Sequence, residues 1–271
     1  MLKFTTLASG SSGNAAVISC GATHVLLDAG ISARRITTGL RELGIDPAEL
    51  SGIFITHDHS DHIAGLTVLT KKVKAPIYAT VPTCRTIALK APCAGELLRE
   101  LVPGEELELG TLTVLPFATS HDTPGSVGYC VYGAGKKLSL CTDLGFVSEE
   151  VARAVRGCDL LVCEANHDPE WVMTGPYPYY LKQRVLGDRG HLSNEAGAEL
   201  ALFAARNGTK EIILAHLSAE NNTPAHALRV VSDYLRRGGV DLDGAVRLGV
   251  APRAELGQTC FLCAKREETA V

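Results

Sequence analysis

Residues 53–62 read Ile-Phe-Ile-Thr-His-Asp-His-Ser-Asp-His, an apolar strand that runs directly into three histidines and two aspartates. Such a cluster at a strand end is costly to desolvate, and its like charges repel one another, unless a cation binds it. Imidazole and carboxylate groups are the usual ligands of zinc, manganese and iron. We therefore expect His57 and His59 to face one metal ion and Asp61 and His62 to face a neighbouring one. The alternative is an ordinary solvated loop.

Three further candidate ligands, His121, Asp143 and His216, each follow a predicted strand elsewhere in the chain. One short cluster cannot complete two coordination shells, so distant ligands are required. Taken singly, each would more often be a polar cap on a strand, but their joint placement favours a shared metal centre. Asp28 ends another strand, and we expect it to orient a histidine of the cluster from behind.

Short β-branched runs alternate with helical patterns along the chain, which indicates a layered α/β fold. The predicted strands are Ala15–Cys20, His24–Asp28, Ile53–Thr56, Thr113–Phe117, Val127–Val131, Lys137–Cys141, Leu160–Glu164, Glu211–Ala215 and Gln258–Ala264. The predicted helices are Ser32–Leu43, His62–Thr70, Thr83–Lys90, Glu149–Arg156, Asn194–Arg206 and Pro224–Arg237. No stretch has the composition of a linker, so we expect residues 1–271 to form one domain.

Composition restricts the classes of partner. A hydrophobic share of 46% and a charged share of 21% are ordinary for a folded protein. The net charge of −4 argues against a protein that coats nucleic acid non-specifically, so any nucleic-acid contact requires a local basic patch. We find no secretory signal and no apolar run near the roughly 20 residues of a membrane helix. With nine scattered cysteines, this predicts a cytoplasmic protein without membrane contact.

The cluster and the three distant candidates together resemble the ligand series of the metallo-β-lactamase superfamily. The matching positions are His57, His59, Asp61, His62, His121, Asp143 and His216. The resemblance implies an αββα four-layer sandwich with two divalent metal ions at one edge of two facing mixed sheets. It assigns His57, His59 and His121 to one ion, Asp61, His62 and His216 to the other, and Asp143 to both.

Motifs outside the ligand series narrow the resemblance to the YycJ (WalJ) subfamily. These motifs are Leu7-Ala-Ser-Gly-Ser-Ser-Gly-Asn14, Glu164-Ala-Asn-His-Asp168, Gly175-Pro-Tyr-Pro178, Gly190-His-Leu-Ser-Asn194 and Ala215-His-Leu-Ser-Ala-Glu-Asn-Asn222. What is known of that group implies a DNA exonuclease acting from 5′ ends, with DNA rather than RNA as its nucleic-acid partner. We assign no role to Glu164, Asn166 or His167.

A two-ion site suits phosphodiester hydrolysis. Two ions about 3.5–4 Å apart can share a water and lower its pKa from about 15.7 toward neutrality, which supplies a bridging hydroxide as the nucleophile. The departing alkoxide needs a proton donor, and His191 is our candidate because it lies in a glycine-flanked turn just before a predicted helix. Asp61, Asp143 and His191 are thus the predicted catalytic residues, with a loop-filling histidine as the alternative for His191.

Two polar segments are candidates for contact with the phosphates. The first is the glycine-rich turn that carries Ser9, Ser11, Ser12 and Asn14, which can also be read as a tight β-turn. The second holds Lys182, Arg184 and Arg189 just before His191, and a solvated helix face would explain it nearly as well. Because no long insertion separates the predicted ligands, we expect an open, uncapped site.

Two other functions stay open from the sequence. A hydrolase of a small thioester or cyclic phosphodiester fits the negative net charge but not the basic segment. A non-catalytic metal-binding module would be favoured by a missing ligand, and none is missing. The sequence does not distinguish zinc, manganese and iron, and it does not give the oligomeric state.

Overall fold

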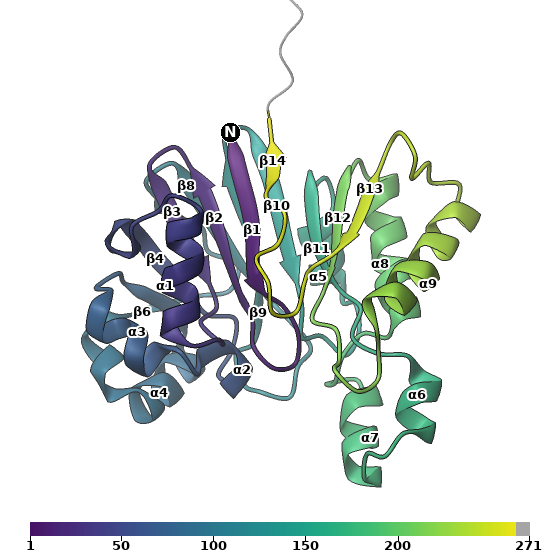
Figure 1. Cartoon of the computed structure of the whole chain (residues 1–271), viewed down its shortest axis with the longest axis horizontal. Coiled ribbons are helices and arrows are strands. Elements are labelled where there is room, and N and C mark those ends of the chain that lie inside the picture. Colours follow the sequence, from purple (N-terminus) through teal and green to yellow (C-terminus); the bar gives the residue numbers. More distant parts are fainter. Residues whose placement is uncertain (264–271) are drawn as a thin grey trace, which may run out of the picture.

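Two mixed sheets face each other in the computed structural model, which describes residues 1–263 (Figure 1). Within that range each sheet has seven strands. The first contains, in spatial order, β14 (Cys260–Leu262), β1 (Leu2–Ala8), β2 (Ala15–Cys20), β3 (Thr23–Leu27), β4 (Leu50–Phe54), β5 (Ile77–Thr80) and β6 (Leu98–Leu101). The second contains β13 (Arg247–Val250), β12 (Glu211–Ala215), β11 (Leu160–Glu164), β10 (Lys136–Cys141), β9 (Val127–Gly133), β8 (Leu112–Ala118) and β7 (Leu107–Leu109).

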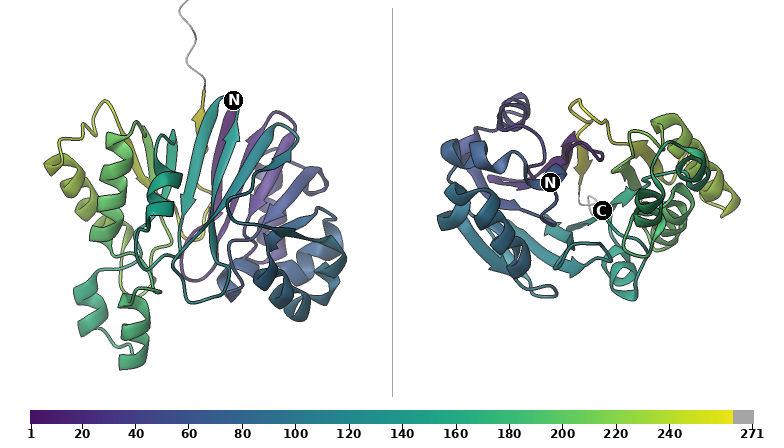
Figure 2. Two further views of the ribbon diagram at one scale, coloured as in Figure 1. Left: turned by 180° about the vertical axis from the view of Figure 1, so that it is seen from behind. Right: turned by 90° about the horizontal axis from the view of Figure 1, so that it is seen from below.

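Helices cover the outer face of each sheet, and a few lie at the lower edge (Figures 1 and 2). The first sheet is covered by α1 (Ala33–Glu42), α3 (Leu66–Lys72) and α4 (Val81–Lys90). The second is covered by α5 (Glu149–Val155), α8 (Asn194–Arg206) and α9 (Pro224–Arg237). The remaining helical elements are α2 (Ser60–Ile63), α6 (Pro169–Thr174), α7 (Tyr179–Leu186) and the short 3₁₀ turns Pro47–Glu49 and Pro92–Leu97.

Three hydrophobic clusters account for the layering. One lies between the first sheet and its helices, one between the second sheet and its helices, and one between the sheets. Strand β2 shows the cause, because every residue in it is buried and successive side chains point to opposite faces. Val17 packs under the helices, whereas Ala16 and Ile18 pack between the sheets. The predicted αββα sandwich is confirmed.

The parallel parts of both sheets bring their carboxyl ends to one edge. In the first sheet β3 and β4 are parallel, and in the second β10, β11 and β12 are parallel. Tyr129 of the second sheet also ties the sheets together near this edge, since its hydroxyl donates a 2.7 Å hydrogen bond to the carbonyl of Ile55. Side chains that follow these strands are therefore delivered to one place.

Several predicted elements match, and others need correction. The strands Ala15–Cys20, Leu160–Glu164 and Glu211–Ala215 and the helices Asn194–Arg206 and Pro224–Arg237 have the predicted bounds. The predicted helix His62–Thr70 is wrong, because the chain forms two helices, α2 and α3, with a break at Gly65. The amide of Gly65 donates to the carbonyl of Ala29, and a Cβ there would lie 2.2 Å from the carbonyl oxygen of Ile31. The final residue of the predicted strand Gln258–Ala264 lies outside the described residues.

The elements that the sequence patterns missed are β1, β5, β6, β7, β13, α6 and α7. Most of the missed strands have only three or four residues, too few to show a period. Among residues 1–263 no helix is both long and apolar enough to cross a membrane. All nine cysteines lie in this range and are unpaired thiols.

Candidate metal centre

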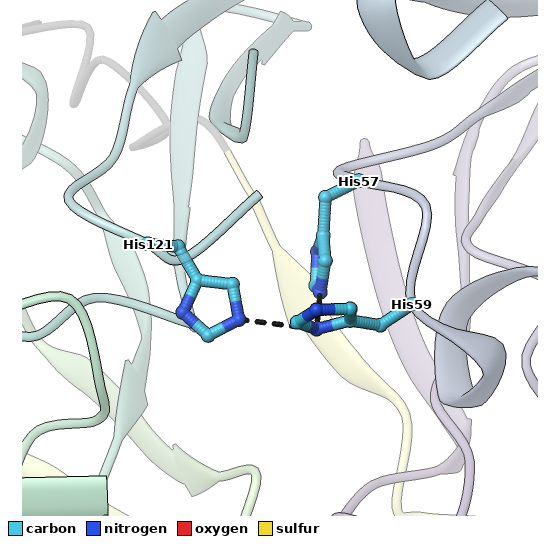
Figure 3. A group of neighbouring side chains, drawn as sticks. All are labelled: His57, His59 and His121. Atoms are coloured by element: carbon cyan, nitrogen blue, oxygen red, sulfur yellow. Dashed lines mark hydrogen bonds between the residues drawn. The ribbon is translucent and has the colours of Figure 1, made fainter. Parts of the chain in front are cut away.

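Three imidazole rings converge where β4 and β8 end. His57 Nε2 lies 3.0 Å from His59 Nδ1, and His121 Nε2 lies 3.2 Å from the same atom (Figure 3). Burial lowers the pKa of all three rings, and for His57 the neighbouring rings lower it further. Each ring is therefore neutral at physiological pH, and its lone pair is available to a cation. The structure brings together the three residues predicted for one ion.

The second predicted group meets beside the first. Asp61 Oδ2 lies 3.3 Å from His62 Nε2 and 3.4 Å from His216 Nε2. Burial lowers the pKa of His216, but Asp143 and neighbouring carboxylates outweigh it and raise that pKa to about 10. The pKa of His62 is likewise raised against the effect of burial, chiefly by Asp28 and Asp143. Strong negative potential thus surrounds these two rings.

Asp143 stands between the two groups. Its carboxylate lies 3.5 Å from His62 Nε2, 3.4 Å from His216 Nε2 and 3.8 Å from His121 Nε2. Atom Oδ2 is buried and accepts no hydrogen bond from any described residue. A buried carboxylate oxygen without a donor is costly, and a cation at this point would satisfy it. The donor set and the orphaned oxygen therefore both fit divalent metal ions.

The backbone at this edge is held in an unusual conformation. Four described non-glycine residues have φ in the left-handed region, and three of them are Asp28 (59°), Asp143 (60°) and His216 (56°). Each such residue costs on the order of 1–3 kcal/mol, which persists only where the surroundings impose it. Asp28 and His216 directly follow β3 and β12, and Asp143 follows the last residue of β10 by two positions, so all three unusual conformations occur where the sheets end.

Asp28 contacts the cluster from behind, as predicted. Its Oδ2 lies 2.8 Å from His62 Nδ1, and its Oδ1 accepts a 2.9 Å hydrogen bond from the amide of Thr56. The carboxylate fixes the ring so that the opposite nitrogen, Nε2, faces Asp61 and Asp143.

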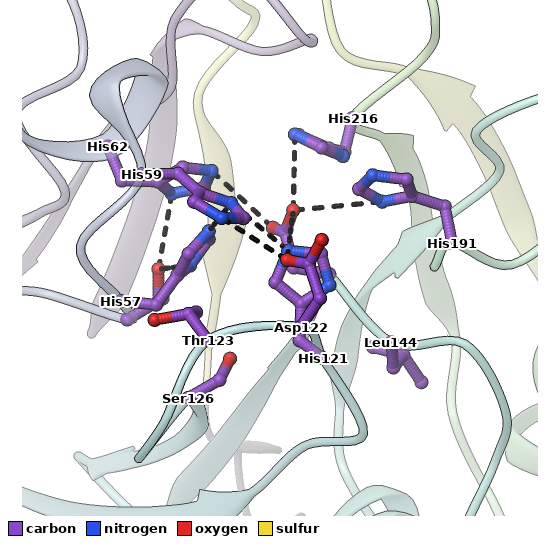
Figure 4. A network of polar contacts seen from close by, with 12 residues as sticks. His57, His59, His62, His121, Asp122, Thr123, Ser126, Leu144, His191 and His216 are labelled. Carbon is purple, nitrogen blue, oxygen red and sulfur yellow. Dashed lines mark hydrogen bonds and ion pairs between the residues drawn. The ribbon is translucent and has the colours of Figure 1, made fainter. Parts of the chain in front are cut away.

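A pocket of about 320 Å³ opens over these side chains. His59, Asp61, Asp143 and His216 line it on the side of the centre. Figure 4 shows the rings of six histidines gathered around this point: His57, His59, His62, His121, His191 and His216.

A family model described as a beta-lactamase superfamily domain matches residues 23–217, which include the whole cluster and the last histidine. The chain belongs to the beta-lactamase superfamily. It is 40% identical over 225 residues to the exodeoxyribonuclease WalJ of Streptococcus pneumoniae serotype 2, covering 81% of this chain and 83% of that protein. It is 34% identical over 250 residues to the exodeoxyribonuclease YycJ of Bacillus anthracis, covering 91% and 94%.

The fold agrees with this membership. The metallo-beta-lactamase fold protein YhfI from Bacillus subtilis superimposes with a TM-score of 0.70 over 96% of this chain and 98% of that one, at 15% identity. At this identity the likeness concerns the fold alone.

Glu164 also contacts the centre, although its position in the sequence alone suggested no role. It is fully buried at the end of β11, and its Oε1 lies 2.8 Å from His191 Nδ1 and 3.0 Å from His216 Nδ1. Its Oε2 accepts 3.1 Å hydrogen bonds from the amides of Leu144 and Leu192. Burial raises the pKa of Glu164, but the two histidines outweigh it and hold that pKa well below its ordinary value. Its position in the sequence could have pointed to it, because β11 lies between β10 and β12, and predicted ligands follow both of those strands.

Two neighbours that also lacked a role lie beside Glu164. The side-chain amide of Asn166 donates a 2.7 Å hydrogen bond to the carbonyl of His216. Burial lowers the pKa of His167 to about 4, so that ring is neutral. Asn166 braces the loop of the last histidine and also lines the pocket.

The glycine-rich turn reaches the pocket only through Ser11. The Ser9 hydroxyl accepts a 2.9 Å hydrogen bond from the amide of His216, so it braces the loop. The side-chain amide of Asn14 lies 3.1 Å from His62 Nε2, and its carbonyl accepts from the amide of Gly10. The structure does not place Ser9, Ser12 or Asn14 on the pocket wall, because Ser9 and Asn14 contact residues of the centre and Ser12 is exposed to solvent.

Like the glycine-rich turn, the basic segment reaches the pocket through only one of its residues. Arg184 lines the pocket and pairs with Asp122 at 2.5 Å, whereas the Lys182 ammonium bonds the carbonyl of Met173 away from it. Arg189 donates to the carbonyl of His121, behind the pocket. Helix α7, which the sequence patterns missed, forms one wall of the pocket through Arg184 and its neighbours.

Proposed function

We propose that this chain is a metal-dependent exodeoxyribonuclease that hydrolyses DNA phosphodiesters from 5′ ends and holds two divalent metal ions. The observation that carries the proposal is the meeting of two three-residue groups at one carboxylate, beside an open pocket. One ion would be held by His57, His59, His121 and Asp143, and the other by Asp61, His62, His216 and Asp143.

The relatives support the substrate class. Both are named exodeoxyribonucleases, and the similarity extends over more than four-fifths of the length of each. The preference for DNA over RNA, the 5′ polarity and the number of ions are parts of our proposal. Zinc, manganese and iron all suit this set of imidazole and carboxylate donors.

Bound divalent cations supply Lewis acidity, which activates a water molecule and offsets the negative charge of phosphate oxygens. The chain itself provides the proton for the departing oxygen. His191 lines the pocket, and its Nδ1 is fixed against Glu164, which leaves Nε2 to hold a proton toward a bound group. Such a donor contributes about 10²–10⁴-fold to the rate. Arg184 lies on the same wall, where its guanidinium pairs with Asp122.

The test uses protein loaded with zinc, manganese or iron and single strands labelled at one end. We expect release of mononucleotides from the 5′ end, lost on chelation and restored by metal. His191→Ala should retain the bound metal, measured by elemental analysis, and lose about 10²–10⁴-fold in turnover. His24→Ala is the matched control, because His24 bonds Ser19 far from the pocket.

Each part of the proposal has its own refutation. Absence of cleavage with every metal tried, together with hydrolysis of a thioester or a cyclic phosphodiester, would replace it with a small-molecule hydrolase. Full turnover in His191→Ala would remove that residue from the mechanism while leaving the nuclease assignment intact.

A further inference from the structure

Four of the five histidines that we assign as metal ligands are held at Nδ1 by an acceptor and face the centre with Nε2. The pairs are His57 with Thr56 Oγ1 (3.0 Å), His62 with Asp28 Oδ2 (2.8 Å), His121 with the Gly190 carbonyl (3.1 Å) and His216 with Glu164 Oε1 (3.0 Å). A ligating imidazole usually donates its other N–H to such an acceptor, which fixes the tautomer and the orientation of the ring.

His59 is turned the other way. Its Nδ1 atom faces the other rings of its group, 3.0 Å from His57 Nε2 and 3.2 Å from His121 Nε2. Its Nε2 atom is therefore the one that needs an acceptor outside the ligand set. Asp122 Oδ1 lies 3.2 Å from this atom (Figure 4).

The same oxygen of Asp122 needs a donor. Atom Oδ1 is buried and accepts no hydrogen bond from any described residue, and the ring nitrogens beside it are His59 Nε2 and, at 3.6 Å, His121 Nε2. The His121 ring carries its proton on Nδ1, because its partner there is the carbonyl of Gly190, which can only accept. His121 Nε2 thus has no proton to donate from a neutral ring. His59 Nε2 is left as the donor that would satisfy the buried oxygen.

Asp122 is itself held from two sides. Its Oδ2 atom accepts a 2.5 Å hydrogen bond from Nε of Arg184 on α7. The next residue, Thr123, donates a 2.5 Å hydrogen bond to the carboxylate of Asp58, in the loop that carries His59. The loop after β8 is therefore fastened to the loop after β4, with the Asp122 carboxylate against the His59 ring.

We propose that Asp122 is a positioning residue for metal binding: it accepts the Nε2 proton of His59 and so keeps the Nδ1 lone pair directed at the ion of the three-histidine group. This inference rests on the metal centre of the proposed function and adds a carboxylate outside the ligand set. Asp28 and Glu164 contact rings assigned to the other ion, so Asp122 would be the corresponding carboxylate for the first ion.

The test measures metal affinity rather than turnover. Asp122→Ala, titrated with zinc against a competing chelator, should bind zinc about 10–100-fold more weakly than the parent. Asp122→Asn keeps the shape of the side chain but offers one acceptor oxygen to two donors, so it should also weaken binding, and it serves if the alanine variant does not fold. Arg184→Ala is the control, since it removes only the half-exposed partner of Asp122 and should change Kd by less than about fivefold.

Two further measurements separate an action through His59 from a general effect of charge. In a His59→Ala background, Asp122→Ala should change the zinc Kd by less than about twofold, because no ring remains to be oriented. In the zinc-loaded parent, the Nε2 proton of His59 should give an NMR signal protected from exchange with water, and Asp122→Ala should remove that signal.

Parental zinc affinity in both Asp122 variants would overturn the inference. An undiminished effect in the His59→Ala background would also overturn it, since Asp122 would then act by its charge or as a ligand itself. An equal loss in Arg184→Ala would do the same, because Asp122 would then act through its pair with α7. The proposed function fails separately: a parent that binds zinc through this pair but releases no nucleotide would refute the nuclease and leave the role of Asp122 in place.

Discussion

Replacing Glu164 with glutamine tests how the centre is held together. The residue is fully buried, and four donors converge on its carboxylate: the ring Nδ1 atoms of His191 and His216 and the amides of Leu144 and Leu192. Glutamine has nearly the same shape but can place only one acceptor oxygen, so its amide group must face two donors whichever way it is turned. The substitution thus removes charge and hydrogen bonds without creating a cavity.

The magnitude follows from those contacts. A buried donor left without its acceptor costs about 1–3 kcal/mol, so two of them should lower the free energy of unfolding of Glu164→Gln by about 2–6 kcal/mol. Loss of the group that orients His216 should weaken metal binding about 10–100-fold. Loss of the group that orients His191 should reduce turnover by about 10²–10⁴-fold even at saturating metal.

Denaturant unfolding, competition with a metal chelator and nucleotide release measure these three effects separately. Glu150→Gln is the matched control, because Glu150 also accepts a backbone hydrogen bond, from Ala118, but lies half-buried on the surface. If Glu164→Gln kept parental metal affinity and turnover, Glu164 would have only a structural role. If its stability were also unchanged, the assignment of the four contacts would be wrong.

Two further predictions concern the backbone at the metal centre and the start of helix α6. Gly30→Ala should lower the free energy of unfolding by at least about 1–3 kcal/mol and weaken metal binding, because a Cβ there would lie 1.6 Å from the carbonyl oxygen of Asp61. Gly95→Ala is the control: a Cβ at Gly95 would meet nothing within 4 Å, so neither quantity should change. Partial burial raises the pKa of Asp168, but hydrogen bonds from His226 and the first turn of α6 bring it below the ordinary value of 3.8. The stability that Asp168 adds to α6 is therefore present above about pH 4 and lost as the pH falls through its lowered pKa. Fluorescence of Trp171, the single tryptophan of the chain, should report that acid transition, and an Asp168→Asn variant that shows the same transition would contradict it.

The sequence was enough to predict the residues of the metal cluster and, through the family resemblance, the four-layer sandwich. His57, His59, Asp61 and His62 follow one apolar strand so closely that a buried cluster without a cation would be prohibitively costly. The distant residues His121, Asp143 and His216 could be proposed because each lies within three positions of the end of a strand, and parallel strands deliver their carboxyl ends to one edge. Short β-branched runs and helical patterns likewise predicted the long central strands and the outer helices.

Which polar groups surround these residues is visible only in the folded chain. Glu164 contacts residues 27 and 52 positions away, and no local pattern records such a contact. For the same reason Ser9 and Asn14, which look like phosphate contacts in the sequence, prove to brace the loops of His216 and His62. Helices α6 and α7 escaped the sequence analysis because both are short and α7 buries no residue, so they leave no hydrophobic period in the sequence. Periodicity records burial against the chain's own core, and α7 buries no residue there.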